Sequence, residues 1–448
     1  MGLQITYMFD TTKIDLMKIG KAVFKNFLYI SFNSLICPVL IILSIIFRSR
    51  KKKKVIFGTT PIINNKYWCQ SLKEIGIEAE TLMSGYYKIN QKEDFDLYFE
   101  DFFPEILKKR ELLYLFAPLL VWIYILKNAK IIVTTFEGIA FKKFFWRLEP
   151  ILARVANIKM IVIPYGADGY MYSRIKDSSL QQVLLASYPE FARKERDITN
   201  KVFYLSKYAD VVITGMMSCD GFPRWDTCVC QPIIIDTKKW QPKKEYSACN
   251  GKNGPVRILH APNHRAFKGT EFILKVAKEL KQEGYDIDLV LLENVPNEKI
   301  RETMQEVDIL VEQLIATGYA MNGIEGMACG LPVLSNLENS LYTTIFKRYS
   351  YLQECPILST TPESLKDNLK LLIENPDKRR SLGEKGRIYV EKYHSYSTFQ
   401  YLFETIIRRL NGESVDLMFL FSTYDLRQEA GEKVQISDNL STSDKQKR

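Results

Sequence analysis

Short apolar segments alternate with helical segments along most of the chain, and this alternation constrains the fold more than any other feature. The strands predicted in the first half are Lys54–Phe57, Lys130–Thr135, Met160–Pro164 and Val211–Thr214. Those predicted in the second half are Val256–His260, Ile287–Leu292, Ile309–Leu310 and Pro332–Ser335. Strands separated by helices form parallel sheets covered by helices. The pattern therefore predicts two doubly wound α/β domains, and ligands of such domains bind outside the carboxyl ends of the strands.

A basic loop follows the predicted strand Val256–His260. It carries Arg265 and Lys268, and a helix is predicted to begin at Thr270, with Thr270 as its N-cap. Free backbone N–H groups and the helix dipole favour an anion at such a place, and the two cations add charge-assisted hydrogen bonds to phosphate oxygens. Taken alone, the loop is equally well explained as a solvated basic surface.

A glycine-punctuated segment, TGYAMNGIEGMACGLPVL, lies fifty residues downstream at 317–334. Gly318 and Gly323 permit tight turns and a close approach of the backbone to a ligand. Glu325 is predicted in the first turn of a short helix. There its carboxylate either complements the helix dipole or accepts two hydrogen bonds from the vicinal hydroxyls of a ribose. The two segments together suit a nucleotide diphosphate.

The stretch from Leu259 to Leu334 resembles the donor domain of GT-B glycosyltransferases of the retaining family 4 type. The matching motifs are H-A-P-N at 260–263, R-x-x-K-G at 265–269 and E-x-M-A-x-G-x-P-V at 325–333. The segments CQPIIIDTKKWQP at 230–242 and YVEKYHS at 389–395 also resemble the family. The resemblance implies a GT-B fold, in which two Rossmann-like domains face a central cleft.

The resemblance also implies roles for individual residues. Arg265 and Lys268 would hold the donor diphosphate as catalytic residues, and Glu325 would hold the ribose. The loop residues expected to bind the donor phosphate and sugar are Gly318, Tyr319, Asn322 and Gly323. Gly58, in the predicted loop after the first strand, is a further expected donor contact.

One departure from the family concerns its Glu-x7-Glu pair. The position of the first acid, eight residues before Glu325, is occupied by Thr317. The identity of the transferred sugar is therefore open. The segment DILVEQ at 308–313 resembles a D-x-x-x-D-Q variant of the family that also lacks this acid.

The acceptor side offers fewer candidates, because His260, His264 and His394 all lie in the second half of the chain. Asp168, in the loop YGADGYMY, resembles the G-S-D variants of the family and is the expected catalytic or acceptor-positioning residue. An Asx-turn in a glycine-rich loop explains it nearly as well. Glu137 is a weaker candidate, on topology alone.

The predicted domains are a membrane anchor with a polybasic flank at 1–53, an acceptor domain at 54–235, a donor domain at 236–410 and a polar extension at 411–448. The first 54 residues hold eight Lys and two Arg against Asp10 and Asp15, so they account for most of the formal net charge of +10. The rest of the chain is nearly neutral, which disfavours a nucleic-acid binder.

The segment Phe27–Phe47 contains 21 residues without a formal charge. As a helix it would reach about 30 Å, the thickness of a bilayer's hydrocarbon core. The basic run RSRKKKK that follows predicts that the later domains lie on the cytoplasmic face. Pro38 and nearby polar residues leave a re-entrant or interfacial helix open. A second apolar run, Leu112–Leu126, is short for a span and is predicted to be a buried helix, with a membrane-dipping surface as the alternative.

These features predict a membrane-associated glycosyltransferase that retains configuration at the transferred sugar. Its substrates would be a nucleotide diphosphate sugar and a lipid-linked or glycan acceptor, in bacterial cell-surface polysaccharide or glycolipid synthesis. No cofactor and no metal ion are expected, because cations and a helix N-terminus can stabilise the departing diphosphate. A UDP-sugar epimerase of the same fold and a non-catalytic scaffold stay open as alternatives.

Overall fold

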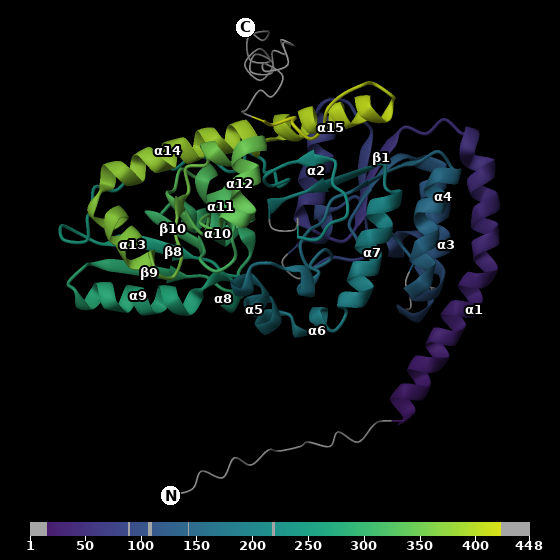
Figure 1. Ribbon diagram of the computed structural model, residues 1–448, viewed down its shortest axis with the longest axis horizontal. Helices are drawn as coiled ribbons and strands as arrows, with labels where there is room; N and C mark the ends of the chain where they lie inside the picture. Colours follow the sequence, from purple (N-terminus) through teal and green to yellow (C-terminus); the bar gives the residue numbers. More distant parts are fainter. Residues whose placement is uncertain (1–15, 88–89, 106–109, 142, 217–219, 423–448) are drawn as a thin grey trace, which may run out of the picture.

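The computed structural model describes residues 16–87, 90–105, 110–141, 143–216 and 220–422. The first fifteen residues and the polar end of the extension lie outside the described residues. Two parallel sheets dominate the structure, one in each half of the chain (Figure 1). The predicted fold class is thereby confirmed.

The first sheet has seven strands in the order β3-β2-β1-β4-β5-β6-β7, and all its pairings are parallel. The strands are β1 (Lys54–Thr59), β2 (Ala79–Met83), β3 (Leu97–Tyr98), β4 (Ala129–Thr134), β5 (Lys159–Val162), β6 (Val211–Thr214) and β7 (Thr227–Cys228). The helices of this half are α1 (Leu16–Ile46), α2 (Ile63–Glu74), α3 (Arg110–Asn128), α4 (Glu149–Val155), α5 (Ser178–Ser187), α6 (Pro189–Ala192) and α7 (Glu195–Tyr208).

The second sheet has five strands in the order β12-β11-β10-β8-β9, again all parallel. The strands are β8 (Val256–His260), β9 (Ile287–Leu291), β10 (Ile309–Gln313), β11 (Val333–Ser335) and β12 (Leu358–Ser359). The helices are α8 (Arg265–Lys268), α9 (Thr270–Gln282), α10 (Asn297–Met304), α11 (Met321–Ala328), α12 (Ser340–Tyr349), α13 (Leu365–Glu374), α14 (Pro376–Tyr393) and α15 (Tyr396–Leu410).

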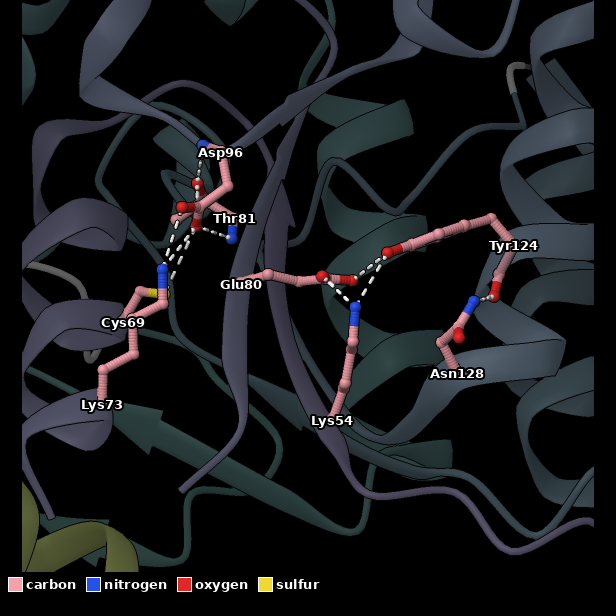
Figure 2. A network of polar contacts seen from close by, with 8 residues as sticks. All are labelled: Lys54, Cys69, Lys73, Glu80, Thr81, Asp96, Tyr124 and Asn128. Carbon is pink, nitrogen blue, oxygen red and sulfur yellow. Dashed lines mark hydrogen bonds and ion pairs between the residues drawn. The ribbon is translucent and has the colours of Figure 1, made fainter. Parts of the chain in front are cut away.

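Neighbouring residues of β2 point to opposite faces of the first sheet, as the two-residue period of a strand requires. Glu80 points toward Lys54 of β1 and Tyr124 of α3, with Nζ–Oε2 and Oη–Oε1 distances of 2.6 and 2.5 Å (Figure 2). Thr81 points the other way and donates its N–H to Asp96 at 2.9 Å. One strand therefore fixes α3 on one face and the segment before β3 on the other.

Helix α1 lies lengthwise along the outside of the first domain and contacts α3 and α4 (Figure 1). Its buried side chains recur every three or four residues, at Tyr29, Asn33, Ile36, Leu40 and Ser44. That spacing is the inward stripe of a packed helix. Helix α3 is buried as predicted for 112–126, because four of its side chains, Val121, Trp122, Ile125 and Leu126, are fully buried.

The last helix returns to the first domain. After α14, α15 packs against α2, where Phe399 stacks on Trp68 with ring centroids 5.7 Å apart. Phe403 of the same helix lies 6.0 Å from the ring of Phe57 in β1. The two domains are thus joined by an apolar contact in addition to the connecting chain.

A second contact between the domains lies beside α8. Phe267 of α8 belongs to a buried apolar cluster formed mostly by α5 and its preceding segment, with Ile175, Leu180 and Leu184. Asn339 donates to the carboxylate of Asp177, the N-cap of α5, at 2.9 Å. The short helix α8 therefore sits at the domain interface, beside α5 (Figure 1).

Candidate functional site

The carboxyl ends of β8 and β10 lie side by side, because these strands are neighbours and run in the same direction. They carry the central part of the candidate site. His260 closes β8 and is 1% exposed. Its Nδ1 donates to the Val311 carbonyl of β10, and its Nε2 lies 2.8 Å from the hydroxyl of Thr270. Burial lowers the pKa of His260 to about 4, so the ring is neutral and Nε2 accepts from Thr270. His260 thus ties both strand ends to α9.

The segment between β8 and α9 differs from the prediction in one detail. Arg265 to Lys268 form a single helical turn, α8, and the N-cap of α9 is Gly269, whose φ of 78° places it in the left-handed region. Thr270 is the first residue of α9, and its hydroxyl is taken by His260. Glycine is suited to the N-cap here because only it adopts that φ without strain.

Lys268 points into the protein and is 6% exposed. Its Nζ donates to Gln313 Oε1 at 2.8 Å and to Glu312 Oε1 at 3.1 Å. Both partners are the last residues of β10, which is longer than the predicted Ile309–Leu310. The same Glu312 oxygen accepts the N–H of Ala320, the N-cap of α11, at 2.8 Å. A buried carboxylate therefore lies between a lysine and a helix N-terminus, where an anion is favoured on both sides.

Three buried oxygen atoms around the loop between β10 and α11 have no hydrogen-bond partner among the described residues. They are Glu312 Oε2, Thr317 Oγ1 and Asn322 Oδ1. A Cβ on Gly323 would lie 2.3 Å from Glu312 Oε2, so a side chain at this position would displace that carboxylate. Buried polar atoms are normally satisfied, and unsatisfied ones can mark the place of a water, an ion or a ligand.

The backbone of the loop is fixed by hydrogen bonds at Gly318. Gly318 has a φ of 129°, donates its N–H to the carbonyl of Asn336 at 2.7 Å and accepts from Gln313 Nε2 at 3.0 Å. Tyr319, predicted to contact the donor, points instead into the core, where its hydroxyl lies 2.8 Å from the hydroxyl of Tyr389 and 3.0 Å from His394 Nε2. Its side chain is fully buried and fully engaged there.

Glu325 lies in the second turn of α11, since the helix begins at Met321, and the predicted first-turn position is wrong. The helix dipole therefore does little for it. Burial, together with the negative charge of Glu312, raises the pKa of Glu325 to about 8, against the hydrogen bond from Asn297 at 3.3 Å. Glu312 contacts Lys268 directly and acts electrostatically on Glu325, so the two motif halves share one region of the second domain.

Arg265 lies at the rim of the site. Its side chain is 40% exposed and paired with Glu271 and Glu293 at 2.8 and 2.9 Å. Its charge is already balanced by two carboxylates. Lys268 is therefore the buried cation of the pair, and Arg265 the solvated one.

Asp168 lies in the loop after β5 and is 5% exposed. Its carboxylate accepts the N–H groups of Phe136, Tyr165 and Gly166 at 2.9, 3.0 and 3.1 Å. Burial nevertheless raises the pKa of Asp168 to about 7. The loop also carries Tyr165, whose hydroxyl donates to Glu137 at 2.7 Å. The structure thus brings Asp168 and Glu137 into one loop cluster of the first domain, and both carboxylates have partners within it.

Gly58 belongs to β1, because the strand continues to Thr59, and the prediction of a loop at 58–61 is wrong there. A Cβ on Gly58 would lie 2.3 Å from the carbonyl oxygen of Leu82 in the neighbouring strand. Packing of β1 against β2 is therefore a sufficient reason for a glycine at this position.

Two site residues were not among the sequence candidates, namely Glu312 and Gln313. They end an apolar parallel strand, and polar residues at the carboxyl end of such a strand point to a ligand site. The resemblance of DILVEQ to a family variant was the available signal. Because the strand was predicted to end at Leu310, Glu312 and Gln313 were not assigned to its carboxyl end.

Comparisons with known proteins concern part of the second domain and the overall fold. Residues 274–389 match the family model of glycosyl transferases group 1, a range that contains Glu312 and Glu325 but not Lys268. An uncharacterized glycosyltransferase of Methanocaldococcus jannaschii is 28% identical over 96 residues, which are 21% of this chain and 26% of that protein. The match thus spans about a quarter of that relative's length.

The fold is similar to that of sucrose-phosphate synthase from Thermosynechococcus elongatus. The TM-score is 0.50 at 14% sequence identity, over 80% of this chain and 99% of that one. A likeness at this identity establishes the fold alone. The chain therefore has the two-sheet GT-B architecture, and its second domain carries, at residues 274–389, a segment similar to glycosyl transferases group 1.

Proposed function

We propose that the chain is a glycosyltransferase that moves a sugar from a nucleotide diphosphate sugar to a hydroxyl group of a lipid-linked or glycan acceptor. The observation that carries this proposal is the arrangement of Lys268, the N-terminus of α11 and three unsatisfied oxygens around the loop between β10 and α11. The match of residues 274–389 to glycosyl transferases group 1 supports it.

The donor diphosphate would meet Lys268 and the backbone N–H groups at the start of α11. In the structure these groups contact Glu312, whose carboxylate would have to turn aside or be protonated when a phosphate approaches. Arg265, at the rim, would add a second cation by leaving one of its carboxylate partners. Cations preorganised at a departing diphosphate are worth about 3 kcal/mol each in the transition state, so the reaction as proposed needs no metal ion.

Glu325 would hold the ribose of the donor. A carboxyl group with a pKa near 8 holds a proton close to neutral pH, so it accepts a hydrogen bond at one oxygen and donates from the other. The two vicinal hydroxyls of a ribose match that pair. Asn322, whose Oδ1 has no partner among the described residues, would accept from a hydroxyl of the donor.

The finer features of the proposal come from the family resemblance. One is that the reaction retains configuration, by a same-face displacement in which the leaving phosphate takes the acceptor proton. Another is a role in cell-surface polysaccharide or glycolipid synthesis. Helix α1 supports membrane association, since Val23–Ser49 is long and apolar enough to cross a bilayer. The basic run after it supports a cytoplasmic location for both domains.

A donor-panel assay on membranes containing the protein tests the proposal. Nucleotide diphosphate sugars labelled in the sugar are supplied, and lipid and soluble products are separated. Labelled sugar on a lipid or glycan supports the transferase. Free nucleotide sugar with altered configuration supports the epimerase, and no turnover of any donor supports the scaffold.

The site assignment is tested by a paired substitution. Lys268→Ala alone would leave the buried Glu312 without its cation, which costs about 3–5 kcal/mol of stability. The double variant Lys268→Met/Glu312→Gln removes both charges and avoids that loss. It is expected to lower kcat/KM about a hundredfold, with the unfolding temperature nearly unchanged. Lys275→Met on the exposed face of α9 is the matched control and keeps full activity. A double variant with normal kcat/KM would place the donor elsewhere.

A further inference from the structure

A pocket of about 430 Å³ lies at the amino ends of β4 and β5 in the first sheet. Its walls come from the segment between α1 and β1, the starts of β4 and β5 and the end of α15. The residues that line it are Arg48, Arg50, Lys51, Lys52, Lys130, Ile131, Asn157, Lys159, Ile407, Leu410 and Asn411. Six of these eleven are cations, and none is a carboxylate. Sequence segments that are far apart thus converge on one positively charged cavity.

Most of these cations are uncompensated. Among the described residues no ion pair involves Arg48, Arg50, Lys51 or Lys130, and only Lys159 has a carboxylate partner, Asp210 at 3.2 Å. Burial and the positive charge of Arg50 lower the pKa of Lys52, whose Nζ donates to the carbonyl of Ala156. Cations held this close together repel one another, and an anion between them would relieve the repulsion.

The neighbouring cations of the same basic run behave differently. Lys53 pairs with Glu78 at 3.5 Å, and Lys54 pairs with Glu80 at 2.6 Å, as Figure 2 shows for the second pair. The run is thus divided. Its last two lysines are balanced by carboxylates, and the residues before them face the pocket.

The pocket adjoins the end of α1, and the packing of α1 indicates what lies next to it. The stripe from Tyr29 to Ser44 is occupied by α3 and α4, so lipid cannot surround this helix as it surrounds a spanning one. The opposite face exposes apolar side chains at Val23, Phe24, Phe27, Leu28, Leu35, Val39, Ile41, Ile42, Ile45 and Ile46. A helix that is packed on protein along one face can place an exposed apolar face in a membrane interface, as interfacial amphipathic helices do.

We infer that this pocket binds the phosphate of an anionic phospholipid headgroup while the outer face of α1 lies in the acyl region of the same leaflet. The inference rests on the membrane association proposed above. Guanidinium and ammonium groups from three segments supply charge-assisted hydrogen bonds to phosphate oxygens, and the amides of Asn157 and Asn411 supply neutral donors. The apolar residues Ile407 and Leu410 line the pocket beside these polar groups.

This placement gives the first domain a fixed orientation on the membrane. The pocket lies at the amino ends of β1, β4 and β5, whereas the loops of Asp168 and Glu137 follow the carboxyl ends of β5 and β4. Headgroup binding would therefore anchor the sheet at its remote edge and leave the loop edge free for substrates.

Vesicle flotation of the full-length protein tests the inference. Vesicles of phosphatidylcholine alone are compared with vesicles that also contain phosphatidylglycerol, at fixed ionic strength. Lys130→Ala removes a pocket cation that is remote in sequence from the basic run, and Lys127→Ala is its matched control three residues away on the exposed end of α3. Lys130→Ala is expected to weaken binding to the anionic vesicles about fivefold and leave binding to phosphatidylcholine unchanged. Lys127→Ala should match the wild type.

A second pair of variants provides an independent test in case Lys130→Ala impairs folding. Arg50→Ala should weaken binding to anionic vesicles more than Lys53→Ala, whose charge Glu78 already balances. Equal losses in both pairs would show a diffuse basic surface and overturn the pocket. Binding of inorganic phosphate to the vesicle-free protein that Lys130→Ala abolishes, while binding to anionic vesicles stays at the wild-type level, would assign the site to a soluble anion and also overturn the inference. Transfer activity is not the readout, so failure of the proposed reaction leaves this test intact.

Discussion

The buried carboxylates of the two domains differ in how completely their oxygens are satisfied. In the first domain Asp168 accepts three backbone N–H groups, and Glu149, which is fully buried, accepts those of Ile139, Ala140 and Phe141 at 2.6–2.8 Å. In the second domain Glu312 is 1% exposed and leaves Oε2 without a partner among the described residues. Thr317 and Asn322 leave an oxygen each in the same state.

The difference separates carboxylates that hold loops in place from those that await a ligand. A carboxylate that accepts several backbone N–H groups has completed its hydrogen bonding, and its removal frees those donors. A carboxylate beside a lysine and a helix N-terminus, with one oxygen unsatisfied, keeps a position that a second anion can take. This difference supports the proposal that the second domain binds the donor, and it favours a structural role for Asp168 in the loops of the first domain.

The largest expected effect concerns Glu325. Glu325→Ala removes the group proposed to hold the ribose, and kcat/KM for the donor is expected to fall about 10- to 100-fold, as loss of hydrogen bonds to a polar ligand does. For Glu325→Gln, which keeps the carbonyl oxygen toward Asn297, kcat/KM should fall less. Steady-state kinetics with the donor that the wild-type enzyme uses measures both variants. If Glu325→Ala retains normal kinetics, Glu325 does not hold the donor.

The second prediction tests whether Asp168 of the first domain holds a loop in place. Asp168→Asn replaces one acceptor oxygen by a donor, so at least one of three backbone N–H groups loses its partner. The free energy of unfolding is expected to fall by about 1–3 kcal/mol. In the folded fraction kcat should change little. Thermal unfolding and kinetics on the same sample decide the matter, and a collapse of kcat with normal stability would make Asp168 catalytic.

The third prediction concerns pH. The folded pKa of Glu325 is about 8, above its ordinary value of 4.5, so between these values the unfolded chain releases a proton that the folded chain keeps. The free energy of unfolding therefore falls as pH rises through this window, and the contribution is fully present below pH 4.5. Asp168, with its pKa raised to about 7, acts with the same sign.

Denaturant unfolding of the wild type and of Glu325→Gln across this window isolates the effect. The neutral amide cannot release a proton, so the variant should lose less stability than the wild type as pH rises. The contribution of Asp168 is common to both proteins and cancels in the difference. Identical pH dependence in the two proteins would mean that neither burial nor the charge of Glu312 raises the pKa of Glu325.

The fold could be predicted from the sequence because hydrophobic periodicity determines it. Strands such as Val256–His260 and Val211–Thr214 have the predicted bounds, since their apolar runs end at turn residues. Lys268 and Glu325 were chosen as candidates because their motifs combine a charge with a predicted helix start, and their roles stay predictions. Their charge partners were not predicted, because a pair such as Lys268 and Glu312 depends on which strand ends adjoin in the sheet.

The errors in the site have the same origin. Gly58 is explained by the approach of Leu82 from a neighbouring strand, and no local pattern predicts that contact. Tyr319 lies in a loop whose glycines suit a ligand, yet its ring turns inward. Glu325 was placed one turn too early, because Met321 and not a polar cap begins the helix. In each case tertiary packing decided the role that the local sequence left open.

The smallest expected effect tests Tyr319 as a core residue. Tyr319→Phe keeps the ring and removes the hydroxyl that bonds Tyr389 and His394. Burial lowers the pKa of His394 to about 4, so its ring stays neutral and loses one hydrogen-bond partner without gaining a charge. The free energy of unfolding should fall by about 1 kcal/mol, while KM for the donor stays unchanged, since the hydroxyl points away from the site. A raised KM with unchanged stability would instead give Tyr319 the donor contact that the sequence suggests, and the loop between β10 and α11 would then have to rearrange when the donor binds.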